Sequence, residues 1–296
     1  MLTDSARRSK RFMKTSVFLC SYESYYEKGL TMLESVDLAV KQGFDAIEPY
    51  PTKELATLED AKRLAEHAGK LGIPVSCFSM GCDMLSPDTA TAVQRLKHYI
   101  DIASELRAPY FHHTLVPHLK PLRFGQADFE SLLPQIVPAV REVCDYASER
   151  GIMCVYEDQG FVFNGVERFG RFLTELDRKD VGVVADLGNI LFVDETPEQF
   201  VGRFSNRLVH VHVKDYLLKS GEGAYPGPAW YMTRHGNFLR DTVFGHGSIS
   251  FVPIFRMLRA IGYDGYFSAE YVAPEPAEKW LPISMDNLKR YYEQAQ

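Results

Sequence analysis

Short apolar runs alternate with longer amphipathic stretches eight times along this chain of 296 residues. The apolar runs have the length of β-strands, and the stretches between them carry apolar residues at helical spacing. Strands that alternate with helices predict a parallel sheet, because each helix carries the chain back to the start of the next strand. Eight such units predict a single-domain α/β protein, a closed (β/α)8 TIM barrel.

The predicted elements follow one another at regular intervals. The strands are expected at 15–20, 44–49, 73–80, 109–113, 152–157, 181–186, 208–215 and 266–271. The helices are expected at 30–42, 58–72, 88–106, 127–150, 166–176, 197–203, 251–261 and 284–293. An open doubly wound sheet is the competing arrangement. The first strand, however, is followed by SYESYYEKG, which lacks the glycine-rich phosphate turn of that fold.

Two segments fall outside this rhythm. The connection 216–245, after the seventh strand, is rich in glycine, proline and aromatic residues and shows no clear periodicity. Long connections of this kind in compact domains are usually functional or disordered, and its aromatic content favours a lid or pocket wall. Residues 1–13 carry a cluster of basic side chains and are expected to form a flexible tail, which leaves 14–296 for the barrel.

Composition excludes several classes of protein. The net charge of −6 offers no global attraction for nucleic acid, and no apolar run reaches the length of a membrane span. The five cysteines are scattered and odd in number, which argues against a disulfide framework or a zinc finger. We therefore expect a cytoplasmic protein with a small-molecule substrate and neither a nucleic-acid nor a membrane partner.

Polar side chains end several of the predicted strands, and the active sites of TIM barrels lie at these strand ends. Glu157, Asp186, His212 and Glu270 come from the fifth to eighth strands in turn. Converging carboxylates repel one another unless a cation offsets their charge. Three carboxylates and one imidazole suit one divalent metal ion, Mn²⁺ first, with Mg²⁺ or Co²⁺ as alternatives.

The motifs around these residues resemble a known family. VYEDQG surrounds Glu157, VVADLGN surrounds Asp186, VHVHVKDY surrounds His212, and GHGSISFVPIFRMLRAIGYDGYFSAEY leads to Glu270. They are similar to the xylose isomerase-like TIM barrel superfamily, in particular its sugar phosphate isomerase/epimerase branch. The resemblance implies that the four residues bind one metal ion and that the two glutamates form an acid/base pair.

The implied activity is that of a sugar isomerase or epimerase. A proton would pass between Glu157 and Glu270 through an ene-diolate that the metal ion stabilises. Loss of a leaving group from the same ene-diolate would instead give a lyase or dehydratase acting on a keto-sugar or a 3-keto-glycoside, including C-glycoside deglycosylation. A sugar-binding barrel without turnover is the non-enzymatic alternative, which the four intact ligands disfavour. Relatives are often dimers or tetramers, so a homo-oligomer is also expected.

Substrate contacts are expected from six further residues. Asn189 stands where many sugar epimerases carry a substrate-binding histidine, and His246 lies in Gly-His-Gly where the family commonly has Gly-Glu-Gly. Lys214 lies near the end of the seventh strand, and Arg234 lies in the long connection. The remaining two are Glu48, at the end of the second strand, and His113, which we expect to face the site while His112 points outward.

Overall fold

Eight parallel strands form the centre of the molecule. The computed structural model describes residues 13–117, 122–123 and 125–296. The barrel strands are β1 (Thr15–Phe18), β2 (Ala46–Glu48), β3 (Phe78–Met80), β4 (Tyr110–His113), β5 (Met153–Glu157), β6 (Gly182–Asp186), β7 (Leu208–Val213) and β11 (Phe267–Ala269). Their hydrogen-bonded order is β2-β1-β11-β7-β6-β5-β4-β3. Between β2 and the approach to β3, the amide of Ile47 donates to the carbonyl of Pro74 and the amide of Ser76 donates to Ile47, which completes the ring.

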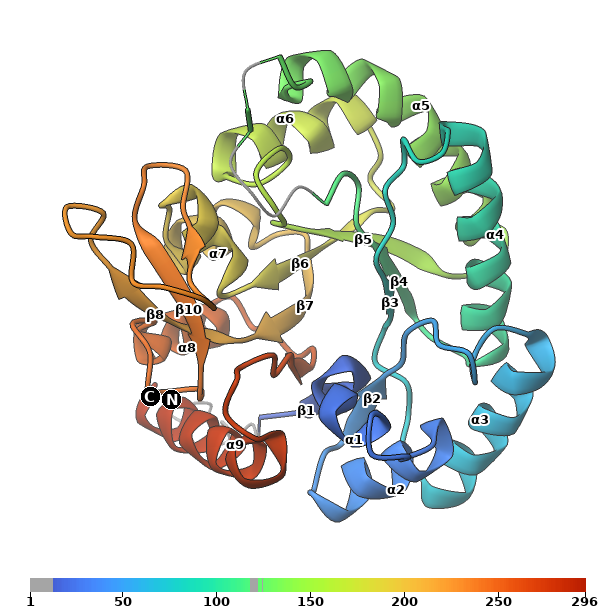
Figure 1. Cartoon of the computed structure of the whole chain (residues 1–296). Coiled ribbons are helices and arrows are strands. Elements are labelled where there is room, and N and C mark those ends of the chain that lie inside the picture. Colours follow the sequence, from blue (N-terminus) through green and yellow to red (C-terminus); the bar gives the residue numbers. More distant parts are fainter. Residues whose placement is uncertain (1–12, 118–121, 124) are drawn as a thin grey trace, which may run out of the picture.

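Helices surround this ring (Figure 1). They are α2 (Met32–Lys41), α3 (Leu58–Leu71), α4 (Thr89–Glu105), α5 (Phe129–Ser148), α6 (Val166–Leu176), α7 (Pro197–Phe204), α8 (Phe251–Ala260) and α9 (Ala277–Gln294). Capping boxes at Thr31, Thr57 and Thr196 satisfy the free amides at the first turns of α2, α3 and α7. The single-domain (β/α)8 barrel expected from the sequence is therefore confirmed.

Short elements occur where the sequence pattern was less regular. A 3-10 turn, η1 (Leu19–Tyr22), and a single helical turn, α1 (Glu23–Tyr26), follow β1, and η2 (Asn189–Val193) follows β6. Helix α9 begins seven residues before the expected position 284 and includes Pro282.

The predicted basic tail lies outside the described residues except for Met13. No helix in the described part of the chain is both long and apolar enough to cross a membrane.

The long connection after β7 is present, but it is more regular than its sequence suggests. Strands β8 (Asp215–Lys219), β9 (Tyr231–Met232) and β10 (Phe238–Thr242) form a small antiparallel sheet in the order β8-β10-β9, which lies to one side of the barrel (Figure 1). These strands are too short, and too widely separated by turn residues, to give a periodic pattern. The Asp194 carboxylate, after η2, anchors the sheet by accepting hydrogen bonds from the Thr233 hydroxyl (2.7 Å) and the Asn237 amide (2.8 Å).

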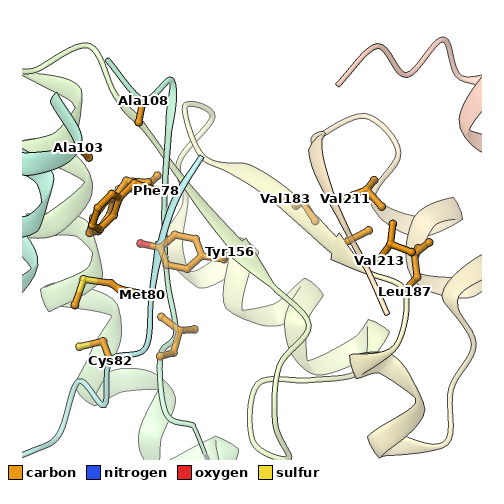
Figure 2. Close-up of a cluster of buried hydrophobic side chains, with 14 of the residues drawn as sticks. Phe78, Met80, Cys82, Ala103, Ala108, Tyr156, Val183, Leu187, Val211 and Val213 are labelled. Atoms are coloured by element: carbon orange, nitrogen blue, oxygen red, sulfur yellow. The ribbon is translucent and has the colours of Figure 1, made fainter. Parts of the chain in front are cut away.

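Strand pleating divides the barrel residues into two sets. Side chains such as Phe78, Tyr156, Val183 and Val211 belong to the main apolar core (Figure 2). The alternate residues Cys77, Val155 and Val184 form a separate small apolar cluster. The same alternation turns the polar residues at the strand ends toward the barrel axis.

Candidate metal centre

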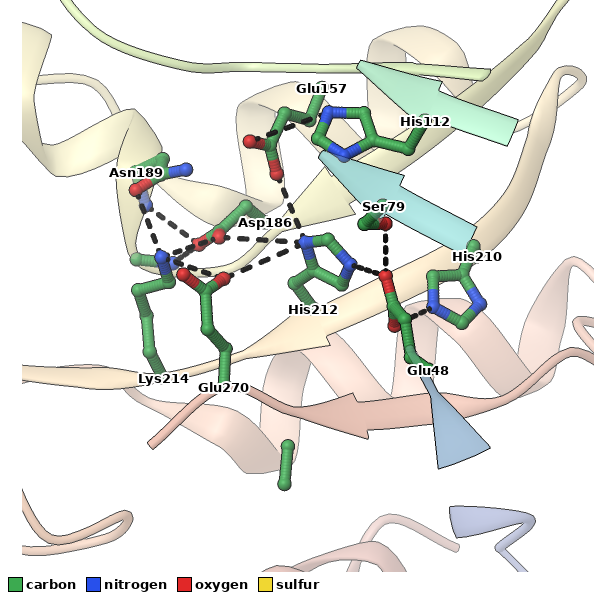
Figure 3. A network of polar contacts seen from close by, with 12 residues as sticks. Glu48, Ser79, His112, Glu157, Asp186, Asn189, His210, His212, Lys214 and Glu270 are labelled. Atoms are coloured by element: carbon green, nitrogen blue, oxygen red, sulfur yellow. Dashed lines mark hydrogen bonds and ion pairs between the residues drawn. The ribbon is translucent and has the colours of Figure 1, made fainter. Parts of the chain in front are cut away.

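The four predicted metal ligands converge at the carboxyl ends of β5, β6, β7 and β11 (Figure 3). The Nδ1 atom of His212 lies 3.0 Å from Glu157 Oε2, 3.7 Å from Glu270 Oε2 and 4.0 Å from Asp186 Oδ2. Parallel strands bring these residues together because their carboxyl ends meet at one end of the barrel. Glu157, Asp186 and His212 are buried, and the side chain of Glu270 is 17% exposed.

Two of the predicted substrate contacts lie beside this cluster. The Lys214 ammonium is 2.9 Å from Asp186 Oδ2, 2.9 Å from Glu270 Oε2 and 3.2 Å from Asn189 Oδ1. The backbone amide of Asn189 donates to Asp186 Oδ1, while its side-chain nitrogen is buried without a hydrogen-bond partner. An amide donor left free next to a charged cluster is available to a bound molecule, because buried polar groups are normally satisfied.

Burial and neighbouring charges shift the titration of the cluster in opposite directions. Burial alone would raise the pKa of Glu157, but His112, His212 and Lys214 outweigh it and lower that pKa to about 2. For Asp186 burial prevails, and its pKa is raised to about 6. Burial opposes the charged form of Lys214, yet Asp186 and Glu270 hold the pKa of its ammonium well above the usual range. Negative charge therefore gathers at this end of the barrel and is partly matched by one ammonium group.

The residues present fit a divalent metal ion. Glu157, Asp186 and His212 each offer a ligand atom, and these atoms lie within 4.8 Å of one another. The donors are mostly carboxylate oxygens, which magnesium and manganese prefer. Asp186 Oδ2 is buried and accepts no hydrogen bond, although it faces the Lys214 ammonium. A metal ion at this position would give that oxygen a second cationic partner beside the ammonium.

The side chains of His112 and His113 on β4 point in the directions opposite to those expected. His112 points into the site, where its Nε2 lies 3.5 Å from Glu157 Oε1 and its ring packs edge-on against His212. His113 points outward: its Nδ1 lies 3.0 Å from the carbonyl of Thr114 and its Nε2 lies 3.1 Å from the hydroxyl of Tyr156. The expected inward orientation of His113 is wrong, because β4 enters the barrel one residue out of phase with the assumed alternation, and its substrate contact stays a prediction.

The structure also corrects the expected sugar contact by Glu48. This residue is fully buried, and both of its carboxylate oxygens are occupied. Its Oε1 accepts from Ser79 and lies 2.9 Å from His212 Nε2, and its Oε2 lies 2.8 Å from His210 Nε2. Burial would raise the pKa of Glu48, but the two histidines hold it well below its usual range. Glu48 is thus an ionised group beneath the site and is inaccessible to a sugar.

Arg234 and His246 take part in loop contacts. The Arg234 guanidinium donates to the carbonyl of Phe161 at 3.1 Å, which ties the small sheet to the loop after β5. His246 is exposed and packs edge-on against Trp280 of α9. Within the described residues, neither makes a recorded contact with the four predicted ligands, so their substrate contacts stay predictions.

Two inward-facing residues, His112 and Ser79, were not predicted from the sequence. Both nitrogens of His112 are buried without a hydrogen-bond partner, so this ring is free to meet a ligand. Ser79, on β3, supports Glu48. Strand alternation counted from the apolar Phe111 would have turned His112 inward, whereas a serine at a strand end carries no signal of its own.

Comparisons with known proteins agree with this fold. The chain shares 30% identity over 138 residues with the inosose dehydratase of Geobacillus thermodenitrificans. That match covers 46% of this chain and 45% of the relative, so it spans less than half the length of either protein. The structure of a xylose isomerase domain protein from Planctomyces limnophilus superposes with a TM-score of 0.73 at 15% identity, over 97% of this chain and 99% of that one.

A second solved structure, the 3-keto-D-glucoside 4-epimerase of E. coli, superposes with a TM-score of 0.71 at 16% identity. It covers 94% of this chain and 99% of that one. At these identities the two superpositions establish the fold alone. The family model for the xylose isomerase-like TIM barrel matches residues 36–291. With eight parallel strands in a ring and a match across most of its length, this chain belongs to the xylose isomerase-like TIM barrel family.

Proposed function

We propose that this protein is a metal-dependent enzyme that removes a proton from the carbon next to the carbonyl of a sugar-like polyhydroxy ketone. The observation that carries the proposal is the convergence of Glu157 and Glu270 on the Nδ1 atom of His212, with Asp186 beside them. A divalent ion bound there, Mn²⁺ first and Mg²⁺ or Co²⁺ as alternatives, would polarise the carbonyl and make the neighbouring C–H acidic.

Glu270 is the better placed of the two glutamates to take this proton. Its side chain is 17% exposed, whereas that of Glu157 is 4% exposed and contacts both His112 and His212. A general base must reach the proton it abstracts, so exposure to the substrate comes first. His112 and Asn189, whose side-chain nitrogens have no partner, would hold substrate oxygens.

Elimination of water is the outcome that we favour. The proton passes to Glu270 as the C–H bond breaks, the C–O bond one carbon further breaks, and the Lys214 ammonium protonates the departing hydroxyl. Water and a carbon–carbon double bond next to the ketone result. Support comes from the 2.9 Å contact between Lys214 and Glu270, which places a proton donor beside the base. The inosose dehydratase from Geobacillus thermodenitrificans offers a precedent at 30% identity, over less than half of the chain.

Epimerisation or isomerisation is the second candidate. Glu157 and Glu270 approach the cluster from different strands, β5 and the end of β11 (Figure 3). If Glu157 returned a proton to the opposite face of the same carbon, the product would be an epimer. Return to the neighbouring carbon would give an aldose–ketose isomer. Both outcomes share the first proton transfer with elimination.

Incubation of the metal-loaded protein with an inosose in D₂O separates these outcomes. Elimination predicts a new ultraviolet absorbance from the conjugated ketone, together with release of water. Epimerisation or isomerisation predicts deuterium incorporation into a ketose with no absorbance change. Lys214→Met should abolish elimination, and Lys219→Met, on the exposed end of β8, is the matched control. If neither reaction is seen over a panel of inososes and ketoses, the proposal fails.

The five cysteines of the chain are free thiols, four of them buried. Free thiols support our proposal of a cytoplasmic enzyme, because disulfides persist mainly in oxidising compartments. The proposed homo-oligomer, a dimer or tetramer, can be checked by light scattering.

A further inference from the structure

Glu48 lies directly beneath the metal centre, on the opposite edge of the His212 ring from Glu157 (Figure 3). His212 Nδ1 faces Glu157 Oε2 at 3.0 Å, and His212 Nε2 faces Glu48 Oε1 at 2.9 Å. The ring is thus held between two carboxylates, of which the upper belongs to the predicted metal ligands and the lower is fully buried.

An ionised carboxylate can only accept hydrogen bonds, so the atom that faces Glu48 must carry a proton. Nδ1 faces an ionised carboxylate as well, that of Glu157, so both ring nitrogens can carry a proton when no metal ion is bound. A metal ion at Nδ1 would take the place of the proton there, and the contact with Glu48 would keep the remaining N–H on Nε2. A histidine binds a metal ion through the nitrogen that lacks the proton. The contact with Glu48 therefore decides which nitrogen of His212 can act as a ligand.

Glu48 is itself held firmly. Ser79 donates to its Oε1, and His210 Nε2 lies 2.8 Å from its Oε2. Ser79 comes from β3 and His210 from β7, so the carboxylate is fixed from two sides of the barrel. Such an arrangement keeps the acceptor aligned with His212 Nε2 even when the site above is empty.

We propose that Glu48 is a positioning residue that holds His212 in the tautomer whose Nδ1 lone pair faces Glu157, Asp186 and Glu270. This inference rests on the proposed metal-dependent function, because the oriented lone pair serves to bind the ion. Groups that orient metal-ligating histidines typically contribute about 10- to 100-fold to metal affinity.

Glu48→Gln tests the proposal, because glutamine keeps the shape but adds an N–H that can donate to His212 Nε2 and move the ring proton to Nδ1. We expect the Kd for Mn²⁺, measured by electron paramagnetic resonance of the free ion, to rise about 10- to 100-fold. Glu59→Gln, which makes the same substitution at an exposed position of α3, is the control. The ¹⁵N spectrum of the His212 ring should be recorded with excess Mg²⁺ and, without metal, at a pH high enough to leave the ring neutral. It should show the proton on Nε2 in the wild type and on Nδ1 in the variant.

The outcomes separate the two proposals. If the wild type binds Mn²⁺ and His212→Gln does not, the metal centre stands. Unchanged Mn²⁺ affinity in Glu48→Gln, or an unchanged His212 tautomer, then overturns the role of Glu48 alone. A wild type that binds no Mn²⁺ refutes the proposed function, and the ring spectrum still decides whether Glu48 sets the tautomer. Two Mn²⁺ ions per chain would also overturn the inference, because Glu48, His210 and His212 would then hold an ion of their own.

Discussion

Substitution of His113 by glutamine should make the protein less sensitive to acid while leaving its catalysis intact. Burial lowers the pKa of His113 from 6.5 to about 3, which its hydrogen bond with Thr114 opposes only in part. The neutral ring has both nitrogens satisfied, since one donates to the carbonyl of Thr114 and the other accepts from the hydroxyl of Tyr156. Protonation would remove the acceptor that Tyr156 uses.

The size of the effect follows from proton linkage. Between pH 6.5 and about 3 the unfolded chain binds a proton at His113 that the folded protein does not. Stability is therefore fully present above pH 6.5 and declines as the pH falls through this window. At pH 5 the medium is 1.5 units below the ordinary pKa, and each unit corresponds to about 1.36 kcal/mol, so the loss is about 2 kcal/mol. This figure holds as long as the folded pKa lies below about 4.

Urea unfolding followed by circular dichroism at pH 7.5 and pH 5.0 measures this loss. The drop in unfolding free energy should be about 2 kcal/mol smaller in His113→Gln than in the wild type. Val140→Ala, in the core of α5, is the control, because the loss of two buried methyl groups lowers stability equally at both pH values. His112, whose pKa burial also lowers, contributes to the acid sensitivity of all three proteins. An equal drop in unfolding free energy in His113→Gln and the wild type would refute the reasoning. Lost activity in His113→Gln would instead support the substrate contact that the sequence suggested.

Three further changes test the site and the small sheet. Glu270→Gln should slow solvent deuterium exchange into the substrate by about 10²- to 10⁴-fold, with an unchanged melting temperature. Gly188→Ala would place a methyl group 2.4 Å from Cγ of Lys214, so we expect a loss of about 1–3 kcal/mol in urea unfolding together with reduced turnover. Asp194→Ala removes the hydrogen bonds to segment 233–237 and should speed limited proteolysis there while the global unfolding free energy changes little.

Much of this architecture could be predicted because its determinants are local. Each barrel strand is an apolar run bounded by turn residues, and Glu157 and Asp186 end such runs, so their meeting follows from the parallel topology. Which of His112 and His113 points toward the barrel axis was harder to predict. A shift of one residue in the entry of β4 exchanges the inward and outward sides, and both residues are histidines that offer no contrast in polarity.

The role of Glu48 escaped prediction for a different reason. Its partners Ser79, His210 and His212 lie 31 to 164 residues away in sequence, and only the closed barrel brings them together. A carboxylate at a strand end is a candidate substrate contact unless the burial of its side chain is known. The small sheet after β7 was equally hidden, because its strands pair with each other across turns and leave no periodic signal.

The distribution of charge explains why this barrel end suits a divalent cation. Both oxygens of the Glu48 carboxylate already have hydrogen-bond partners in Ser79, His210 and His212. Above it, Glu157, Asp186 and Glu270 carry three negative charges when ionised, and the Lys214 ammonium supplies one positive charge. A metal ion on Nδ1 would leave His212 neutral, so these four groups would hold a net charge of −2, which one divalent ion balances and a monovalent ion does not. Because buried charges are stable only when paired, a bound metal ion and the Lys214 ammonium, which contacts Asp186 and Glu270, would together offset the charge of the carboxylates.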